Sequence, residues 1–136
     1  MNDYKVGQAA ELETVISDES VREYARISGD NNPIHLDDSY AAASNFGQRI
    51  AHGMLVAGSI SNLIGTKFPG YGTIYVSQSL KFRAPVYVED RIRTAVEVIK
   101  VDKERKRLTL KTEVVKVKDG TNVICGEAVV IPPGWV

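Results

Sequence analysis

Asp30 and His35 lie five residues apart in the segment Ser-Gly-Asp-Asn-Asn-Pro-Ile-His, which is rich in turn formers. Gly29 allows a sharp exit from a preceding helix and Pro33 stiffens the return, so the loop can hold both side chains in one relation. A carboxylate and an imidazole held in this way could catalyse the addition of water to an α,β-unsaturated thioester. This reaction needs a base that deprotonates the water attacking C3 and a group that donates a proton to C2. The alternative is that Asp30 caps a turn and His35 packs beside it, which is the commoner outcome for an isolated pair.

A second segment, Ala-His-Gly-Met-Leu, begins the most apolar helical stretch of the chain at His52 and Gly53. A helix N-terminus offers unpaired N–H groups, and glycine lets a carbonyl oxygen approach them closely, so the Gly53 amide could stabilise an oxyanion. The alternatives are helix packing for Gly53 and a polar helix cap for His52. Further along, Ser59 and Ser61 could line the same site or bond back to a carbonyl one turn earlier.

The elements that would hold these residues are helices in the first half of the chain and strands in the second. The first helix starts after Ser17 as N-cap and ends at Ser28-Gly29, and a shorter one starts at Asp37-Asp38 and ends near Asn45-Phe46-Gly47. A third helix, from His52 to Ile64 with Gly65 as its stop, is apolar on nearly every side, so we expect it to be buried.

From Gly72 onward the chain is strand-like, with β-branched residues and an alternating stretch from Ile74 to Phe82. The other expected strands are Leu12–Ile16, Arg91–Val101, Leu108–Val117 and Asn122–Ile131, with a charged turn over 102–107 and a hairpin at Asp119-Gly120. An antiparallel meander after one apolar helix indicates an α+β fold in which the sheet wraps around that helix.

The composition restricts the possible functions. A chain of 136 residues predicts a single domain spanning residues 1–136. Lys plus Arg and Asp plus Glu each number 17, so no net charge favours nucleic acid. The only cysteine, Cys125, and two histidines form no zinc-ligand cluster, and no Gly-rich nucleotide motif or nucleophile elbow appears. The absence of a signal peptide or membrane span in the sequence predicts a cytoplasmic protein that does not enter the membrane.

Three segments, in matching order and spacing, resemble the MaoC-like family of (R)-specific enoyl-CoA hydratases and (R)-3-hydroxyacyl thioester dehydratases. They are Tyr24 to Asp37, with the family's hydratase signature, Ile50 to Leu55 and Ser79 to Val86. The resemblance implies a single hot-dog fold with the apolar helix at its centre, and a homodimer. It also implies that Asp30 activates water, that His35 shares this task or relays the proton, and that the Gly53 amide holds the thioester carbonyl, with no metal and no organic cofactor.

By the same resemblance Ser61 matches a serine near the catalytic pair of some members, and Asn32 and His52 are further candidates to line the site. The expected substrate is a trans-2-enoyl-CoA, hydrated reversibly to the (R)-3-hydroxyacyl-CoA. Three alternatives remain open: dehydration of acyl-carrier-protein (ACP) thioesters, thioester hydrolysis, and a non-catalytic acyl-thioester-binding subunit. The acyl group itself is not determined by the sequence.

Overall fold

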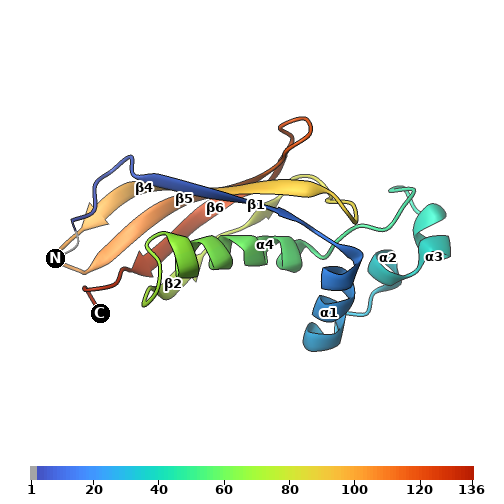
Figure 1. Cartoon of the computed structure of the whole chain (residues 1–136), viewed down its shortest axis with the longest axis horizontal. Helices are drawn as coiled ribbons and strands as arrows, with labels where there is room; N and C mark the ends of the chain where they lie inside the picture. The colour runs from blue at the N-terminus through green and yellow to red at the C-terminus, as the bar shows by residue number, and fades with distance from the viewer. Residues whose placement is uncertain (1–2) are drawn as a thin grey trace.

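The computed structural model describes residues 3–136, whose backbone forms one antiparallel sheet with a long helix along one of its faces (Figure 1). The strand order is β1-β4-β5-β6-β2, with β3 also paired to β6. The strands are β1 (Ala9–Val15), β2 (Ile74–Gln78), β3 (Lys81–Phe82), β4 (Arg91–Asp102), β5 (Arg107–Lys116) and β6 (Asn122–Ile131). The α+β prediction is therefore confirmed, and β1 and β2 are the two edges of the sheet.

The helices are α1 (Asp18–Ser28), α2 (Pro33–Leu36), α3 (Asp38–Ala42) and α4 (Gly53–Asn62), and α4 continues as a wider π-type turn, η1 (Leu63–Lys67). In Figure 1, α4 runs along the sheet, whereas α1, α2 and α3 gather at one end of the molecule. No helix within residues 3–136 is long and apolar enough to cross a membrane.

The core lies between α4 and the sheet. On β4 every second residue from Ile92 to Val98 is buried, and β5 alternates in the same way from Leu108 to Val114. Strand geometry places such residues on one face of a sheet, and here that face is covered by Val56 and Ile60 of α4 and by residues of η1. Burial of this apolar face holds α4 against the sheet and so fixes where its N-terminus lies.

The expectation that the apolar helix would be buried is correct for one face only. Met54 is 55% exposed, and Gly58, Ser61 and Asn62 are also exposed, so α4 has one buried face and one open face. The residue pattern could not distinguish the two faces, because apolar side chains occur on both.

Several expected boundaries also moved. β1 begins at Ala9 and not at Leu12, and α3 ends at Ala42 and not near Asn45. The helical chain passes Gly65, the expected stop, and ends at Lys67, before Pro69. The alternating stretch from Ile74 to Phe82 is divided into β2 and β3, with a bulge in the pairing of β2 with β6. Gly126 on β6 faces the interruption: a Cβ there would lie 1.9 Å from the Ser79 carbonyl oxygen, so only glycine permits this close crossing.

Candidate active site

Helix α1 and its caps deliver Asp30 to the site. The Ser17 side chain accepts a hydrogen bond from the Ser20 N–H, and Gly29 ends the helix in the left-handed conformation at φ 81°. The sharp exit expected from Gly29 is thus present, since that conformation is strained for residues with a side chain. Asp30, exposed on the loop that follows, accepts a hydrogen bond at Oδ1 from the Asn32 N–H at 3.2 Å. The carboxylate therefore makes a turn contact as well as facing the pocket described below.

Asn32 caps the next element. Its Oδ1 accepts a hydrogen bond from the Ile34 N–H at 3.2 Å, and Pro33 occupies the first turn of α2. The segment expected to be a stiff loop thus contains one short helix, because proline and an Asn cap both favour a helix start. Asn32 is exposed and is not among the residues that line the pocket. The structure places Asn32 as the residue that orients α2, which carries His35.

His35 is 8% exposed and is held by two backbone contacts. Its Nδ1 lies 2.7 Å from the Ile50 carbonyl oxygen, and its own carbonyl accepts a hydrogen bond of 2.9 Å from Nε of the buried Arg49. A carbonyl oxygen can only accept, so Nδ1 carries the proton and, in the neutral ring, Nε2 is a bare acceptor. Arg49 also pairs with Asp18 at the start of α1. The sequence contained no distinctive signal for this bracing role of Arg49.

The environment of His35 favours its neutral form. Burial lowers the pKa of His35 below 6.5, and the electrostatic interaction with His52 acts in the same direction, against the opposing effects of the Ile50 carbonyl and of Asp30. A lowered pKa keeps Nε2 available as a base at neutral pH.

This pKa shift predicts a pH dependence of stability. Because the folded pKa lies below 6.5, the unfolded chain binds the proton more tightly, and stability from this group falls as the pH drops below about 6.5. We expect the free energy of unfolding of the wild type to decrease between pH 7.5 and pH 5.5 by more than that of His35→Asn, measured by denaturant titration at both pH values. Equal decreases for the two proteins would contradict the prediction.

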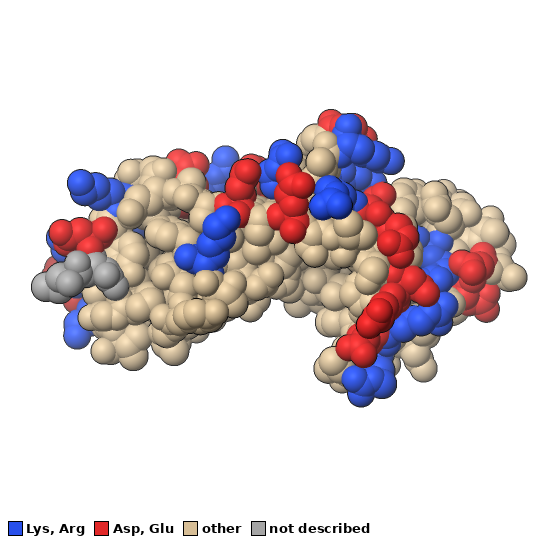
Figure 2. All heavy atoms as spheres, viewed as in Figure 1, with Lys and Arg blue, Asp and Glu red and all other residues tan. Residues whose placement is uncertain are grey.

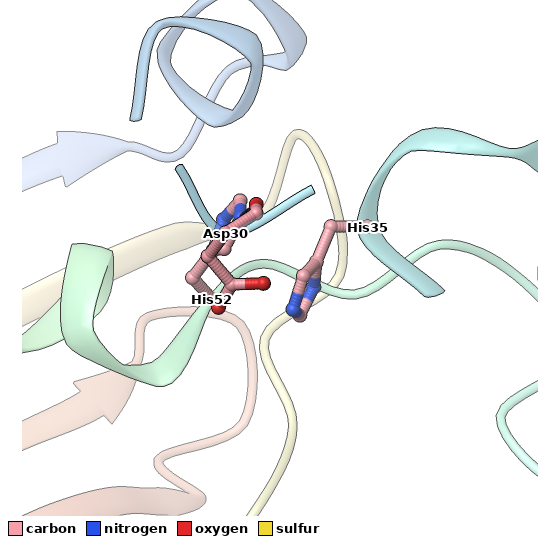
Figure 3. A group of neighbouring side chains, drawn as sticks. All are labelled: Asp30, His35 and His52. Carbon is pink, nitrogen blue, oxygen red and sulfur yellow. Dashed lines mark hydrogen bonds between the residues drawn. The ribbon is translucent and has the colours of Figure 1, made fainter. Parts of the chain in front are cut away.

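His52, directly before α4, completes a cluster with Asp30 and His35 (Figure 3). A carboxylate oxygen of Asp30 and one ring nitrogen from each histidine lie within 4.8 Å of one another. The two imidazole rings are stacked, with centroids 3.9 Å apart and an interplanar angle of 30°. His52 makes no side-chain cap of α4, so that alternative for its role was wrong; its Nε2 lies 3.0 Å from the Asp30 carbonyl oxygen instead.

The same cluster has residue types that bind metals. A histidine nitrogen binds metal through a lone pair in the ring plane, about 2 Å from the ion. Each ring uses one nitrogen on a backbone carbonyl and keeps the other for a further partner. The mechanism below assigns the Asp30 carboxylate and the free nitrogen of His35 to water and routes no step through a metal.

A pocket of about 510 Å³ lies beside the cluster. Its lining residues come from the Asp30 loop, α2, the start of α4, β3 and β6: Asp30, His35, Phe46, Ile50, Ala51, His52, Gly53, Met54, Val56, Phe82, Arg83, Ala84, Pro85, Val86, Val123 and Ile124. Most of these side chains are apolar, with polar groups concentrated at the cluster and at Arg83. Such a pocket suits an apolar chain that ends in one reactive polar group.

Gly53 is the first residue of α4 and is exposed toward the pocket. The first N–H groups of a helix have no intrahelical acceptor, and the His52 side chain does not cap them. A Cβ on Gly53 would lie 2.7 Å from Cε1 of Phe82, so the absence of a side chain keeps this helix end open. Phe82 was not expected from the sequence to take part, because its proximity to Gly53 depends on how β3 pairs with β6.

The two serines of α4 differ in position. Ser59 is buried, donates to the Val56 carbonyl at 2.7 Å and lies 2.6 Å from the Thr94 hydroxyl of β4, so it bonds back along the helix. Ser61 is exposed on α4 and does not line the pocket. Within one chain, therefore, neither serine reaches the cluster. The structure brings together Asp30, His35, His52 and Gly53, and leaves Asn32 and Ser61 outside.

An antiparallel sheet packed on one long central helix is the hot-dog fold, and the pocket at the helix N-terminus places a carboxylate and two imidazoles beside an open set of amides. The chain belongs to the MaoC-like family, whose domain model, "MaoC like domain", matches residues 3–129.

Characterised relatives agree with this assignment. The chain is 45% identical to an (R)-specific enoyl-CoA hydratase of Rhodospirillum rubrum, over 96% of this chain and 90% of that protein. It is 39% identical to a mitochondrial 3-hydroxyacyl-acyl-carrier-protein dehydratase of Arabidopsis thaliana, over 95% of this chain and 78% of that one. The solved (R)-hydratase from A. caviae involved in PHA biosynthesis superposes with a TM-score of 0.94 at 39% identity, over 98% of this chain and 100% of that chain.

Proposed function

We propose that this protein is a lyase that catalyses the reversible addition of water to a trans-2-enoyl-CoA, forming the (R)-3-hydroxyacyl-CoA. The observation that carries the proposal is the pairing of the Asp30 carboxylate with the bare Nε2 of His35 in a mostly apolar pocket beside the uncapped N-terminus of α4. The MaoC-like family and the names of its hydratase members support the same reaction.

In the hydration direction, one water molecule sits between Asp30 and His35. As its oxygen forms a bond to C3, one of its protons passes to this pair, and the C2–C3 π electrons move toward the thioester carbonyl. The negative charge on the carbonyl oxygen is met by the Gly53 N–H, where a fixed donor is worth about 10²–10³ in rate. The pair then returns the proton to C2, so the product gains one water and the pair is unchanged. Delivery and return by one pair on one face gives syn addition.

The structure favours a thioester without determining its carrier. Relatives include enzymes named for CoA substrates and, at lower identity, for acyl-carrier-protein substrates, so the ACP dehydratase activity stays the second candidate. Thioester hydrolysis is less well supported, because the relatives compared above are named for hydration or dehydration.

The test is a direct assay. Crotonyl-CoA and longer trans-2-enoyl-CoA substrates should lose the absorbance of the conjugated thioester on addition of enzyme, and the product should be the (R)-3-hydroxyacyl-CoA by chiral analysis. Rates on matched CoA and ACP thioesters distinguish the two carriers. A thiol reagent in a parallel sample detects hydrolysis. Release of free thiol without hydration, or no reaction with either carrier, would refute the proposal.

We also propose that the protein is a homodimer joined along β2 and the open face of α4. β2 is an edge strand with exposed apolar side chains at Ile74, Tyr75 and Val76, and α4 has an exposed apolar side chain at Met54. Figure 2 shows that charged side chains gather along the sheet and around α1 to α3, whereas the surface over α4 and β2 is mostly uncharged. An apolar edge strand of this kind is unfavourable in water unless it is covered.

The dimer proposal predicts a specific effect of charge at the β2 edge. Light scattering after size exclusion should give twice the 14.9 kDa chain mass for the wild type and a mass near that of one chain for Val76→Glu. The matched control is Ile99→Glu, because Ile99 is 40% exposed, similar to Val76 at 47%, but lies on β4. The control should remain a dimer. A monomeric wild type, or a dimer unaffected by Val76→Glu, would contradict the proposal.

We also propose a cytoplasmic location, which cell fractionation would test.

A further inference from the structure

His52 is a buried imidazole that the proposed reaction does not use directly. It is 2% exposed, and its ring lies between those of His35, at 3.9 Å, and Tyr24 of α1, at 4.7 Å. One nitrogen, Nε2, contacts the Asp30 carbonyl at 3.0 Å; the other, Nδ1, is buried and has no hydrogen-bond partner within residues 3–136. An unpaired buried nitrogen beside a reacting pair requires an explanation.

The contact of His52 with Asp30 determines which ring nitrogen donates. The Asp30 carbonyl oxygen only accepts hydrogen bonds, so Nε2 carries a proton. The Nε2–H of His52 therefore holds the backbone of Asp30, and the other ring nitrogen, the buried Nδ1, is without a hydrogen-bond partner within residues 3–136.

We propose that His52 is a positioning residue for the hydration, which fixes the Asp30 backbone through Nε2–H and keeps water off one face of the His35 ring. The inference rests on the proposed function, because it assigns His52 a role in the work of the Asp30 and His35 pair. Both contacts come from one side chain. The loop carrying Asp30 and the helix carrying His35 are thereby tied to the start of α4, where the carbonyl of the substrate would bind.

The first contact matters because Asp30 lies on an exposed loop. Among the residues that the structure describes, its carboxylate is hydrogen-bonded only to the Asn32 N–H, which belongs to the same loop. The His52 contact connects that loop to α4, 22 residues further along the chain. Displacement of a catalytic group by about 1 Å lowers the rate about 10²-fold. The contact that holds the Asp30 loop against α4 should therefore affect kcat more than KM.

The second contact affects the basicity of His35. The groups facing this ring or its backbone are Asp30 from the loop, His52 from the start of α4 and Arg49, which binds the His35 carbonyl; Arg83 of the chain after β3 lines the same pocket. His52 covers one face of this ring. Burial is the largest of the causes that lower the pKa of His35, and the stacked ring supplies part of it.

Two variants separate the two contacts. His52→Phe keeps a ring against His35 but has no N–H for the Asp30 carbonyl. We expect kcat to fall about 10²-fold with KM nearly unchanged, and the acid limb of the kcat/KM profile to move less than when the ring is removed, because a ring still buries His35. His52→Gln places an amide N–H near the position of Nε2 but removes the ring. We expect it to retain more of kcat than His52→Phe, and its acid limb to move up toward the ordinary histidine value of 6.5.

A matched control is Tyr24→Leu, which removes the aromatic ring that packs 4.7 Å from the His52 ring and leaves the pair of His35 and His52 rings in place. Its Tm should fall while kcat and the acid limb stay near wild type. If both His52 variants lower only Tm, with wild-type kcat per folded enzyme and an unmoved profile, the inference is overturned. If the Asp30 and His35 variants described below are also fully active, the proposed function itself fails, so the two failures are distinguishable.

Discussion

Asp30→Asn should lower kcat/KM for enoyl-CoA hydration by about 10²–10⁴-fold, the usual contribution of a general acid or base. The substitution is nearly isosteric, and its amide oxygen can still accept the hydrogen bond from the Asn32 N–H that the Asp30 carboxylate accepts at 3.2 Å. The turn is therefore kept, whereas an amide cannot take a proton from water. Steady-state hydration rates with crotonyl-CoA, together with Tm, measure the effect; we expect Tm to change little because Asp30 is exposed.

Asp119→Asn is the matched control for this variant. Asp119 stands in the hairpin between β5 and β6, and its Oδ1 accepts a hydrogen bond from the Thr121 N–H at 3.0 Å, the same two-residue turn contact that Asp30 makes. It does not line the pocket. Its activity should match the wild type. An Asp30→Asn enzyme that is as active as Asp119→Asn would leave Asp30 with only its turn role and remove the basis of the mechanism.

His35→Asn should cause a second loss of about 10²–10⁴-fold. The asparagine amide N–H can occupy the position of Nδ1, which lies 2.7 Å from the Ile50 carbonyl, so the contact that orients α2 is preserved. What disappears is the bare Nε2. The rate of the variant should also lose the acid limb that His35 contributes to the pH profile, so its kcat/KM should vary less between pH 5 and pH 7 than that of the wild type.

The double variant Asp30→Asn with His35→Asn tests whether the pair acts on one water. Groups that act as a unit are strongly non-additive, so the double variant should be only slightly slower than the slower single variant. If the rate losses of the two single variants multiply in the double variant, Asp30 and His35 perform separate tasks. The catalytic water would then not lie between the two side chains. A His35→Asn enzyme with wild-type rate at neutral pH would contradict the assignment of His35 as a base.

Much of the local structure could be predicted from the sequence because it depends on neighbouring residues. Ser17 as N-cap and Gly29 as the left-handed terminator were both correct, since each acts through hydrogen bonds or backbone geometry within a few residues. β6 has the bounds expected, Asn122–Ile131, because strand alternation and the Asp119-Gly120 turn are local signals. The position of Asp30 and His35 on one short segment could also be predicted, because the two residues are close in the sequence.

The errors lie where contacts are long-range. Gly65 did not end the α4 helix, because the packing of Leu63 and Ile64 in the core carries the chain on to Lys67. Similarly, the close crossing of Ser79 by Gly126 divides a stretch whose alternation favoured one continuous strand. A periodic pattern reports which residues prefer burial, but it contains no information on which distant segment buries them.

The order of residues specifies which chemical groups are present and how the local turns present them: a carboxylate and an imidazole on one capped segment, and a glycine at the start of an apolar helix. The contact of His52 with His35, the contact of Arg49 with α2 and the position of Ser61 outside the pocket depend on the folded chain. They arise because burial of the α4 face on the sheet places the helix N-terminus against the Asp30 loop. That placement follows from the packing of residues far apart in the chain, and not from the spacing of residues within any one segment.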